Sequence, residues 1–362
     1  MWHIVIMISL WLYSPMPDLR CPALSNHFLD ILHPGRKEIN LSMSQESTAV
    51  AGGKKVTLVV PGSTSNLGPG LDCIGLALNI YSRMTFQLLE EPEDGDKPYI
   101  QLKGGIAKRS DPEHQGNLIY HMLKEIWEHN SKLLGRLRIS VTSDIPLGSG
   151  LGSSSAAIVG AIWASNVLED RIPTATQLLA KGCELEGHPE TLAASLYGNM
   201  VVCAPSVAGR RIVTQRVEWP DDWHVIAVVP DYTLHTADLR AVLPKHVKYE
   251  DAVFNAQRTA LLVAAVSRHD ESAMQEALHD RLHEKYRQKF VPELEDLRRE
   301  LVNEPILGCV MSGAGASTCI FVHSKNKDKV VRKLNHWAAA QEKSHRILNL
   351  QVSKEGMQEV EI

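Results

Sequence analysis

A run of glycine and serine between a predicted strand and a predicted helix is the feature that most constrains this chain. The segment 144–164 reads DIPLGSGLGSSSAAIVGAIWA, with glycines at 148, 150 and 152 followed by serines at 153–155. Residues 135–146 alternate apolar and polar side chains like a half-buried strand, and the apolar residues after the serines indicate a buried helix. This order predicts a glycine loop that ends at a helix N-terminus.

Such a loop is suited to bind phosphate. Glycines let the backbone approach a ligand closely, and the helix start presents unpaired N–H groups and a positive dipole end. Serine hydroxyls add donors, so the segment predicts an anion site. The simpler alternative is a turn that only caps the helix. The P-loop pattern GxxxxGK[ST] is absent because no Lys follows the glycines, and GxGxxG is interrupted at Ser153.

The composition narrows the class of protein. The chain has 362 residues, of which 44% are hydrophobic and 22% charged, and its formal net charge is -4. These values are typical of a globular protein of one or two domains, and they argue against nucleic acid as a partner. The six cysteines form no CxxC pair, which argues against structural zinc and against a disulfide framework. We therefore expect a cytoplasmic enzyme with reduced thiols.

Residues 1–50 form an N-terminal extension with two interpretations. The apolar opening MWHIVIMISLWLY is too short to span a bilayer, and no Lys or Arg precedes it as in a secretory signal. The first interpretation is a mis-assigned start, with Met43 as the true first residue. The second is a signal or an anchor. No site motif precedes Lys55, so we favour the first and expect no membrane partner.

The coarse pattern predicts an α+β fold. Strands are expected at 55–63, 74–90, 135–146, 199–205, 209–218 and 224–231, and helices at 117–130, 154–168 and 174–187. Residues 248–304 read as helical with a break at Val291-Pro292, followed by a strand, a glycine turn and a strand over 306–324. Grouped rather than alternating elements favour α+β over a parallel α/β sheet. We predict two domains, 51–210 and 211–362.

Three motifs together resemble a known superfamily. PLGSGLGSSSA (146–156) resembles the phosphate loop PxxxGLGSSA of the GHMP kinases. PGSTSNLGPGLDCIGLAL (61–78) is similar to their N-terminal motif, and within the superfamily to that of the homoserine kinases; CVMSGAGAST (309–318) resembles their C-terminal glycine motif. The resemblance implies a domain like the second domain of ribosomal protein S5, then a ferredoxin-like domain, with the site between them, in a homodimer.

The resemblance also implies that the loop binds ATP with Mg²⁺. Glu184 looks like the metal ligand, helped by Ser153, although a glutamate on a helix can also be a solvated surface charge. The residues assigned to ATP are Pro146, Leu147, Gly148, Ser149, Gly150, Leu151, Gly152, Ser153, Ser154, Ser155 and Ala156.

The acceptor implied by the resemblance is L-homoserine, a zwitterion with a terminal hydroxyl, and the product is O-phospho-L-homoserine on the way to threonine. A carboxylate favours guanidinium partners. The segments TLHTADLRAVLP (233–244) and HDRLHEKYR (279–287) resemble family segments that place Arg240 and Arg287, so the resemblance implies these two for the carboxylate, and Asp72 with Asn66 for the amino and hydroxyl end. The full substrate set is Asn66, Asp72, His188, Arg240, Arg287, Gly313 and Gly315, and the catalytic set is Glu184, Asn66, Thr236 and Arg240.

The chain departs from the homoserine kinase pattern in one segment. Those enzymes usually read E-G-H-P-D-N, whereas here Glu190 and Thr191 stand in the last two places. Thr191 cannot act as a general base at neutral pH, so catalysis by positioning and charge stabilisation is expected. Two alternatives remain open: a GHMP kinase for another alcohol of the mevalonate type, and a nucleotide-binding member without catalysis.

Overall fold

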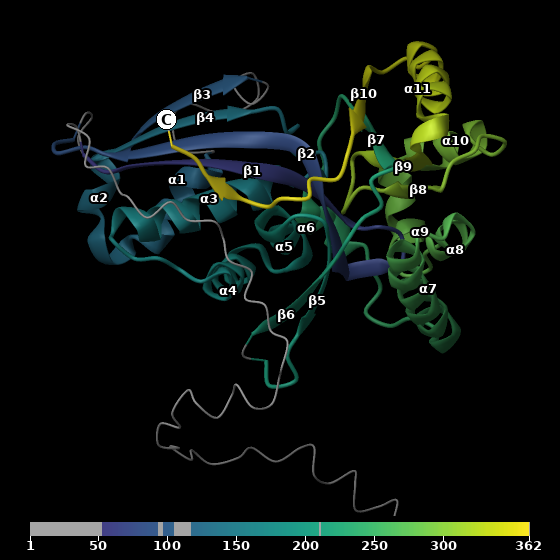
Figure 1. The fold of residues 1–362 in the computed structure, drawn as a ribbon, viewed down its shortest axis with the longest axis horizontal. Helices are drawn as coiled ribbons and strands as arrows, with labels where there is room; N and C mark the ends of the chain where they lie inside the picture. Colours follow the sequence, from purple (N-terminus) through teal and green to yellow (C-terminus); the bar gives the residue numbers. More distant parts are fainter. Residues whose placement is uncertain (1–52, 93–96, 105–116, 210, 362) are drawn as a thin grey trace, which may run out of the picture. The chain divides into compact units, whose positions relative to one another are not determined.

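The computed structural model describes residues 53–92, 97–104, 117–209 and 211–361. The predicted N-terminal extension, with its alternative start at Met43, lies outside these residues. Two β-sheets with helices packed against them make up the described part (Figure 1). The predicted α+β class is confirmed, because helices and strands are grouped rather than strictly alternating.

The first sheet carries the N-terminal motif and the strand that leads into the glycine–serine loop. Its strands are β1 (Lys55–Asn66), β2 (Gly70–Leu88), β3 (Tyr99–Gly104), β4 (Leu137–Ser143), β5 (Met200–Pro205), β6 (Ile212–Val217) and β11 (Gln358–Glu359). Their order is β11-β1-β2-β4-β3, with β5 paired to β2 and β6 to β5. Only β3 and β4 run parallel among these pairs. The long β2 pairs with β5 near its start and with β4 near its end.

Helices cover one face of this sheet (Figure 1). They are α1 (Leu118–Ile126), α3 (Ser153–Leu168), α4 (Ala175–Glu186) and α5 (Glu190–Tyr197), with the short η3 (Glu128–Asn130) and α2 (Lys132–Gly135) after α1. Helix α3 packs on β1 and contacts α1, α4 and α5. That central position explains why α3 is apolar on nearly all sides. Gly160 allows the close approach, because a Cβ there would lie 2.4 Å from Cε of Met84 on β2.

The second sheet has a ferredoxin-like topology, as the resemblance implies. It consists of β7 (Trp223–Pro230), β8 (Gly308–Met311), β9 (Thr318–His323) and β10 (His345–Leu350). All three pairings are antiparallel in the order β10-β7-β9-β8, so the four strands follow the spatial order 4-1-3-2. A hydrophobic core lies between this sheet and the helices α10 (Glu293–Glu300) and α11 (Ser324–Ala339).

A helical region connects β7 to β8. It contains α6 (Thr236–Ala241), α7 (Tyr249–Arg268), α8 (Glu271–Ala277), α9 (Glu284–Arg287), η4 (Gln288–Phe290) and α10. The predicted break at Val291-Pro292 is confirmed, because α10 begins only after Pro292. Proline lacks the N–H that a continuing helix would need, but it is accepted at a helix start.

The chain passes from the first sheet to the second between Val217 and Trp223, a few residues beyond the predicted boundary at 210. It then returns at its C-terminal end. Val352 bridges Leu78 of β2, and β11 pairs with β1. The C-terminal residues therefore belong to the first sheet, although the division into two domains at the predicted residues stays a prediction.

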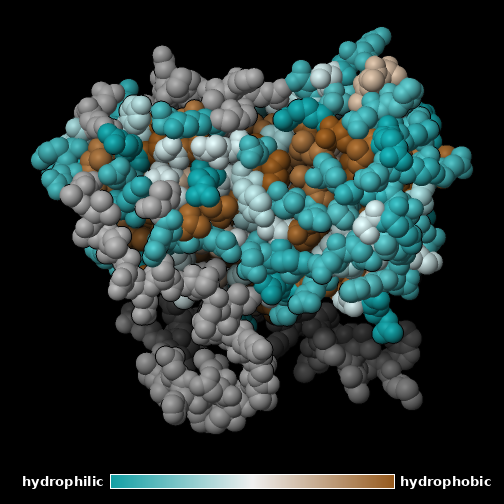
Figure 2. All heavy atoms as spheres, turned by 45° about the horizontal axis from the view of Figure 1, so that its top comes forward, coloured by the Kyte–Doolittle hydropathy of each residue, from teal (hydrophilic) through white to brown (hydrophobic). Residues whose placement is uncertain are grey.

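Among the described residues, no helix is long and apolar enough to cross a membrane. On the face drawn in Figure 2, hydrophobic residues appear in separate places among hydrophilic ones. The exposed large hydrophobic side chains, such as Ile172, Val207 and Val302, come from distant parts of the sequence.

Candidate active site

The glycine–serine loop lies between β4 and α3, as the sequence predicts. Gly148, Gly150 and Gly152 all have positive φ, at 59°, 79° and 77°. A Cβ at Gly150 would lie 2.2 Å from the carbonyl oxygen of Ser312, and one at Gly152 would lie 2.5 Å from the backbone nitrogen of Ser63. The glycines are therefore required by both the backbone conformation and the close packing of other loops.

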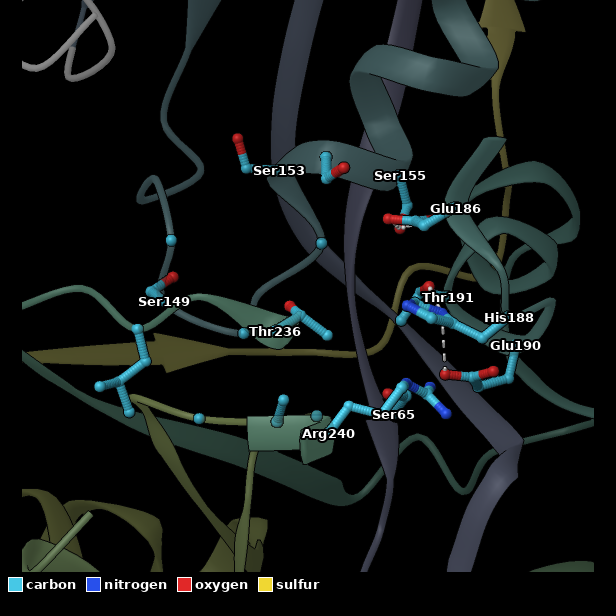
Figure 3. A pocket seen from close by; sticks show the side chains of 18 of the residues that line it. Ser65, Ser149, Ser153, Ser155, Glu186, His188, Glu190, Thr191, Thr236 and Arg240 are labelled. Atoms are coloured by element: carbon cyan, nitrogen blue, oxygen red, sulfur yellow. Dashed lines mark hydrogen bonds and ion pairs between the residues drawn. The ribbon is translucent and has the colours of Figure 1, made fainter. Parts of the chain in front are cut away.

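A cavity of about 460 Å³ opens at the start of α3. Figure 3 shows Ser153 and Ser155 at that helix start, with Thr236 and Arg240 on the opposite side of the same hollow. No side chain caps the α3 N-terminus, so its first N–H groups are not satisfied by a cap. The position is suited to an anion such as phosphate.

Most of the predicted site residues line this cavity. From the loop these are Gly148, Ser149, Gly150, Gly152, Ser153, Ser154 and Ser155, and from elsewhere Asn66, Asp72, His188, Thr236, Arg240, Arg287, Gly313 and Gly315. Pro146, Leu147, Leu151, Ala156 and Glu184 are not among the lining residues. Leu151 and Ala156 are buried in the core instead, because the loop turns their side chains away from the cavity.

Of the two acidic residues near the end of α4, Glu186 rather than the predicted Glu184 lies at the cavity. Glu186 lines the cavity, and both of its carboxylate oxygens accept hydrogen bonds from Oγ of Ser155, at 3.1 and 2.9 Å. Glu184 has a side chain that is 67% exposed and pairs with Lys181 at 3.0 Å. Residues i and i+2 of a helix project in directions about 200° apart around its axis, so only one of these two side chains can face the cavity. Burial raises the pKa of Glu186 above its ordinary value.

The segment from the last residue of β1 to the start of β2 has an unusual backbone and contacts other parts of the cavity wall. Asn66 and Asp72 have positive φ of 71° and 55°, as does the intervening Leu67 at 43°. The side-chain amide of Asn66 donates to the carbonyl of Gly313 at 2.8 Å, and its oxygen accepts from the backbone N–H of Asp72 at 3.1 Å. Asn66 thus connects the N-terminal motif (61–78) with the C-terminal glycine motif (309–318).

Asp72 and Arg240 are bonded to each other. Nη1 and Nη2 of Arg240 donate to the two carboxylate oxygens of Asp72, each at 2.8 Å. Burial opposes ionisation of Asp72, but the Arg240 guanidinium holds its pKa below the ordinary value. Although Asp72 and Arg240 are predicted to bind opposite ends of the acceptor, in the structure they form one ion pair at the cavity.

Arg287 is buried at the cavity wall, with only 1% of its surface exposed. Its Nε donates to the carbonyl of Leu239 at 3.1 Å, and its Nη1 lies 3.3 Å from Nδ1 of His283. Nε2 of His283 donates to the carbonyl of Gly68 at 2.7 Å, so His283 ties Arg287 to the loop after β1. Burial lowers the pKa of Arg287. No ion pair in the described part of the chain involves Arg287, in contrast to Arg240.

His283 is itself held by Asp280, which is not among the predicted site residues. One carboxylate oxygen of Asp280 accepts from the backbone N–H groups of His283 and Glu284, both at 2.8 Å. The other accepts from Leu282 N–H at 3.0 Å and from the amide of Asn255 at 2.8 Å. These bonds satisfy the N–H groups at the start of α9 and orient the segment that carries Arg287.

The segment that departs from the family pattern also faces the cavity. His188, Glu190 and Thr191 all line it, and Figure 3 shows the Glu190 carboxylate beside the His188 ring. Nδ1 of His188 lies 3.4 Å from Oε1 of Glu190 and 3.4 Å from Oγ1 of Thr191. Burial opposes protonation of His188, but Glu190 raises its pKa above the ordinary value.

The third glycine motif completes the wall. Gly313 and Gly315 have positive φ of 57° and 102°. The backbone N–H of Gly313 donates to the carbonyl of Ser65 at 3.2 Å, and the Ser312 hydroxyl donates to the carbonyl of Gly150 at 2.7 Å. All three motifs found in the sequence therefore contact one another.

Several lining residues are not among the predicted site residues. Ser65, Glu186 and Ala314 lie within or beside quoted segments, so their nearness was a usable signal. The apolar part of the wall, Leu118, Met122, Ile158 and Leu185, comes from three helices whose packing the motifs do not reveal. An apolar wall beside a phosphate-binding loop is typical of a nucleotide site.

Comparison with known proteins agrees with this geometry. The family model described as GHMP kinases N terminal domain matches residues 117–199, and the one described as GHMP kinases C terminal matches residues 262–340. The crystal structure of homoserine kinase from Cytophaga hutchinsonii superposes with a TM-score of 0.73 at 22% identity, covering 88% of this chain and 99% of that one. This structural likeness supports the predicted GHMP kinase fold.

Relatives found by sequence identify the family more specifically than the structural likeness does. A homoserine kinase from Crocosphaera subtropica is 32% identical over 283 residues, which are 78% of this chain and 90% of the relative. A homoserine kinase from Clostridium botulinum is 34% identical over 273 residues, or 75% of this chain and 88% of the relative. The three motifs, the cavity that they enclose and these relatives lead to one conclusion: the chain belongs to the homoserine kinase family of the GHMP kinases.

Proposed function

We propose that this protein transfers the γ-phosphoryl group of ATP to the hydroxyl of L-homoserine, giving O-phospho-L-homoserine. The observation that carries the proposal is one cavity with two chemically different ends. One end is the serine-rich start of α3, and the other holds the charged side chains Asp72, Glu190, Arg240 and Arg287. A phosphate donor and a small zwitterionic acceptor fit such a pair of ends.

ATP is proposed to bind with its phosphates at the α3 N-terminus. The backbone N–H groups there and the hydroxyls of Ser153 and Ser154 are donors for phosphate oxygens. The adenine ring then lies against the apolar wall around Met122 and Leu185. Thr236 faces the loop from α6, where its hydroxyl is available to the transferring group.

The residues beside the loop fit a magnesium ion. Mg²⁺ prefers oxygen ligands and is usually held by one or two carboxylates together with phosphates and water. Glu186, with Ser155 bonded to it, offers such oxygens next to the phosphate position. A buried carboxyl whose pKa is raised also favours a nearby cation when ionised. We assign the metal to Glu186 and a neighbouring serine; bound there, it would neutralise charge on the phosphates.

The contribution of the chain is mainly positioning. Phosphoryl transfer needs the two substrates held in line and the developing charge stabilised. The three loops contact one another, so a change in one alters the cavity wall formed by the others. Arg240 is close enough to Asp72 to form two hydrogen bonds and still presents a cation to the cavity.

The test measures ADP release with a panel of alcohols: homoserine, homoserinol, 4-hydroxybutyrate and mevalonate. We expect homoserine to be the best acceptor and ³¹P NMR to identify a phosphate ester on its hydroxyl. Turnover with mevalonate but not homoserine would favour a kinase of another alcohol, and nucleotide binding without turnover would favour a non-catalytic member. The homodimer and the cytoplasmic location stay predictions.

A further inference from the structure

Glu190 has a buried carboxylate oxygen with no partner. The residue is 2% exposed, and its Oε1 lies 3.4 Å from Nδ1 of His188. Its Oε2 has no hydrogen-bond partner in the described part of the chain. A carboxylate oxygen out of contact with water and without a donor is costly, and Glu190 lines the cavity. A ligand that brings an N–H donor would remove this cost.

The other carboxylates at the cavity already have donors. Both oxygens of Asp72 accept from Arg240 at 2.8 Å, and the two oxygens of Glu186 share the single hydroxyl proton of Ser155. Among the lining carboxylates, only Glu190 therefore has an oxygen without a donor. The guanidinium groups differ in the same way: Arg240 is paired with Asp72, whereas within the described residues Arg287 forms hydrogen bonds only to the carbonyl of Leu239 and to His283.

We propose that Glu190 is a specificity-determining residue that accepts a hydrogen bond from the ammonium group of the acceptor, while Arg287 binds the acceptor carboxylate. The proposal rests on the proposed function, since it concerns the amino-acid acceptor of that reaction. It differs from the assignment of the ammonium to Asp72, because the bidentate bond to Arg240 satisfies Asp72 within the chain itself.

The local backbone fixes the position from which the Glu190 side chain extends. Glu190 is the first residue of α5, and its backbone carbonyl packs against β2: a Cβ at Gly75 would lie only 2.1 Å from it. That contact fixes where the side chain begins. Glutamate is one methylene longer than the aspartate usual at this position in homoserine kinases, so its carboxylate lies farther from the helix start. The hydroxyl of Thr191 lies near His188, at 3.4 Å from Nδ1.

The experiment compares two acceptors that differ only in the amino group, homoserine and 4-hydroxybutyrate. In E190Q, kcat/KM for homoserine should fall about tenfold to hundredfold, the usual effect of losing one charge-assisted hydrogen bond. The value for 4-hydroxybutyrate should change by less than about threefold, since it has no ammonium to lose. KM for ATP and the melting temperature should stay near those of the wild type.

The matched control is E300Q, which removes a carboxylate from α10 that pairs with Lys333 at 2.7 Å and does not line the cavity. It should leave both acceptors unaffected. If E190Q does not fold, E190D replaces it; this variant keeps the charge and withdraws the oxygen, so a smaller loss confined to homoserine is expected.

Three outcomes would overturn the assignment of Glu190. These are unchanged turnover of homoserine in E190Q, equal losses for both acceptors, and a wild-type protein that neither phosphorylates nor binds homoserine. Failure of the proposed phosphoryl transfer can be distinguished from failure of the Glu190 assignment. If the wild type binds homoserine by calorimetry in the presence of ADP but no alcohol is phosphorylated, weaker homoserine binding by E190Q still supports the ammonium site, and equal binding rejects it.

Discussion

Glu184 and Glu186 lie two positions apart in α4, and their side chains have different surroundings. Glu186 accepts hydrogen bonds from Ser155 at the cavity, whereas Glu184 is exposed and bonded to Lys181. The spacing in the sequence is compatible with either residue as a metal ligand. The orientation of α4 decides which of the two lies at the cavity, because a helix presents only one side to the glycine–serine loop.

The two glutamates make a direct test of the metal assignment. Glu186→Gln should weaken the apparent affinity for Mg²⁺ by at least about tenfold, since the carboxylate charge is lost beside the phosphates. Glu184→Gln should stay within about twofold of the wild type, because an exposed ion pair contributes little. Titration of activity with Mg²⁺ at saturating ATP measures both. Equal effects in the two variants would remove Glu186 from the metal site.

The ion pair of Asp72 and Arg240 predicts a pH dependence of stability. The folded-state pKa of Asp72 is held below its ordinary value, so the pair stabilises the fold above the ordinary aspartate pKa and loses this effect as the pH falls toward the lowered value. Both side chains are about 40% exposed, so solvent screening limits the effect at neutral pH to about 0.2–1 kcal/mol. Asp72→Asn should therefore be less stable than the wild type at about pH 7 and nearly equal to it at about pH 3. Urea unfolding measures the difference, and a gap that is independent of pH would contradict the prediction.

At the scale of elements, the three glycine-containing segments contact one another and so connect the first sheet with the second. The loop before α3 touches the third glycine motif through Gly150 and Ser312, and the loop after β1 reaches that motif through Asn66. Glycine in these loops is usually explained by the approach of a ligand. At Gly68, Gly150 and Gly152 the approach of other backbone segments is a second reason, because a Cβ there would lie 2.5, 2.2 and 2.5 Å from backbone atoms of Leu278, Ser312 and Ser63.

Alanine substitutions at two glycines separate the effect of backbone strain from the effect of overlap with neighbouring segments. Gly150→Ala places a methyl group against the carbonyls of Ser312 and Gly315, at 2.2 and 2.6 Å, in a residue with φ of 79°. Left-handed strain and overpacking together should lower the free energy of unfolding by about 2–5 kcal/mol, and ATP should bind more weakly. Gly209→Ala, with φ of 67° and nothing within 4 Å, has only the strain of about 1–2 kcal/mol. Calorimetric melting and nucleotide titration test both, and equal effects would show that the contacts at Gly150 are unimportant.

At the scale of the whole described chain, the residues that follow the last strand of the second sheet return to the first sheet and pair with its strands β1 and β2. Val352 pairs with Leu78, Met357 is buried, and Glu359 accepts a hydrogen bond from Nε1 of Trp163 at 3.0 Å. Residues near the two ends of the described sequence are thereby neighbours in one sheet. Such a connection makes the stability of the first sheet depend on residues that follow the last strand of the second.

A chain that ends after Leu350 should be markedly less stable. It loses the buried side chain of Met357, which alone contributes about 1.5–3 kcal/mol, together with β11 and the bond to Trp163. A chain that ends after Val360 keeps all three and serves as the control. Thermal unfolding of both proteins checks the prediction, and identical melting temperatures would show that the C-terminal segment is not needed by the first sheet.

The sequence by itself determined the features whose causes are local. The periodicity predicted most strands and helices and the break at Pro292, and the three glycine motifs predicted a phosphate loop and the superfamily. Left-handed backbone needs glycine and a buried helix needs apolar residues wherever they occur, so these signals can be read without the fold. The tertiary structure alone decided which charges meet: Glu186 rather than Glu184 at the cavity, Asp72 paired with Arg240, and Glu190 left with an unpaired oxygen. The physical reason is that hydrogen bonds and desolvation depend on distances between segments far apart in the sequence, which only the packing of the two sheets and their helices sets.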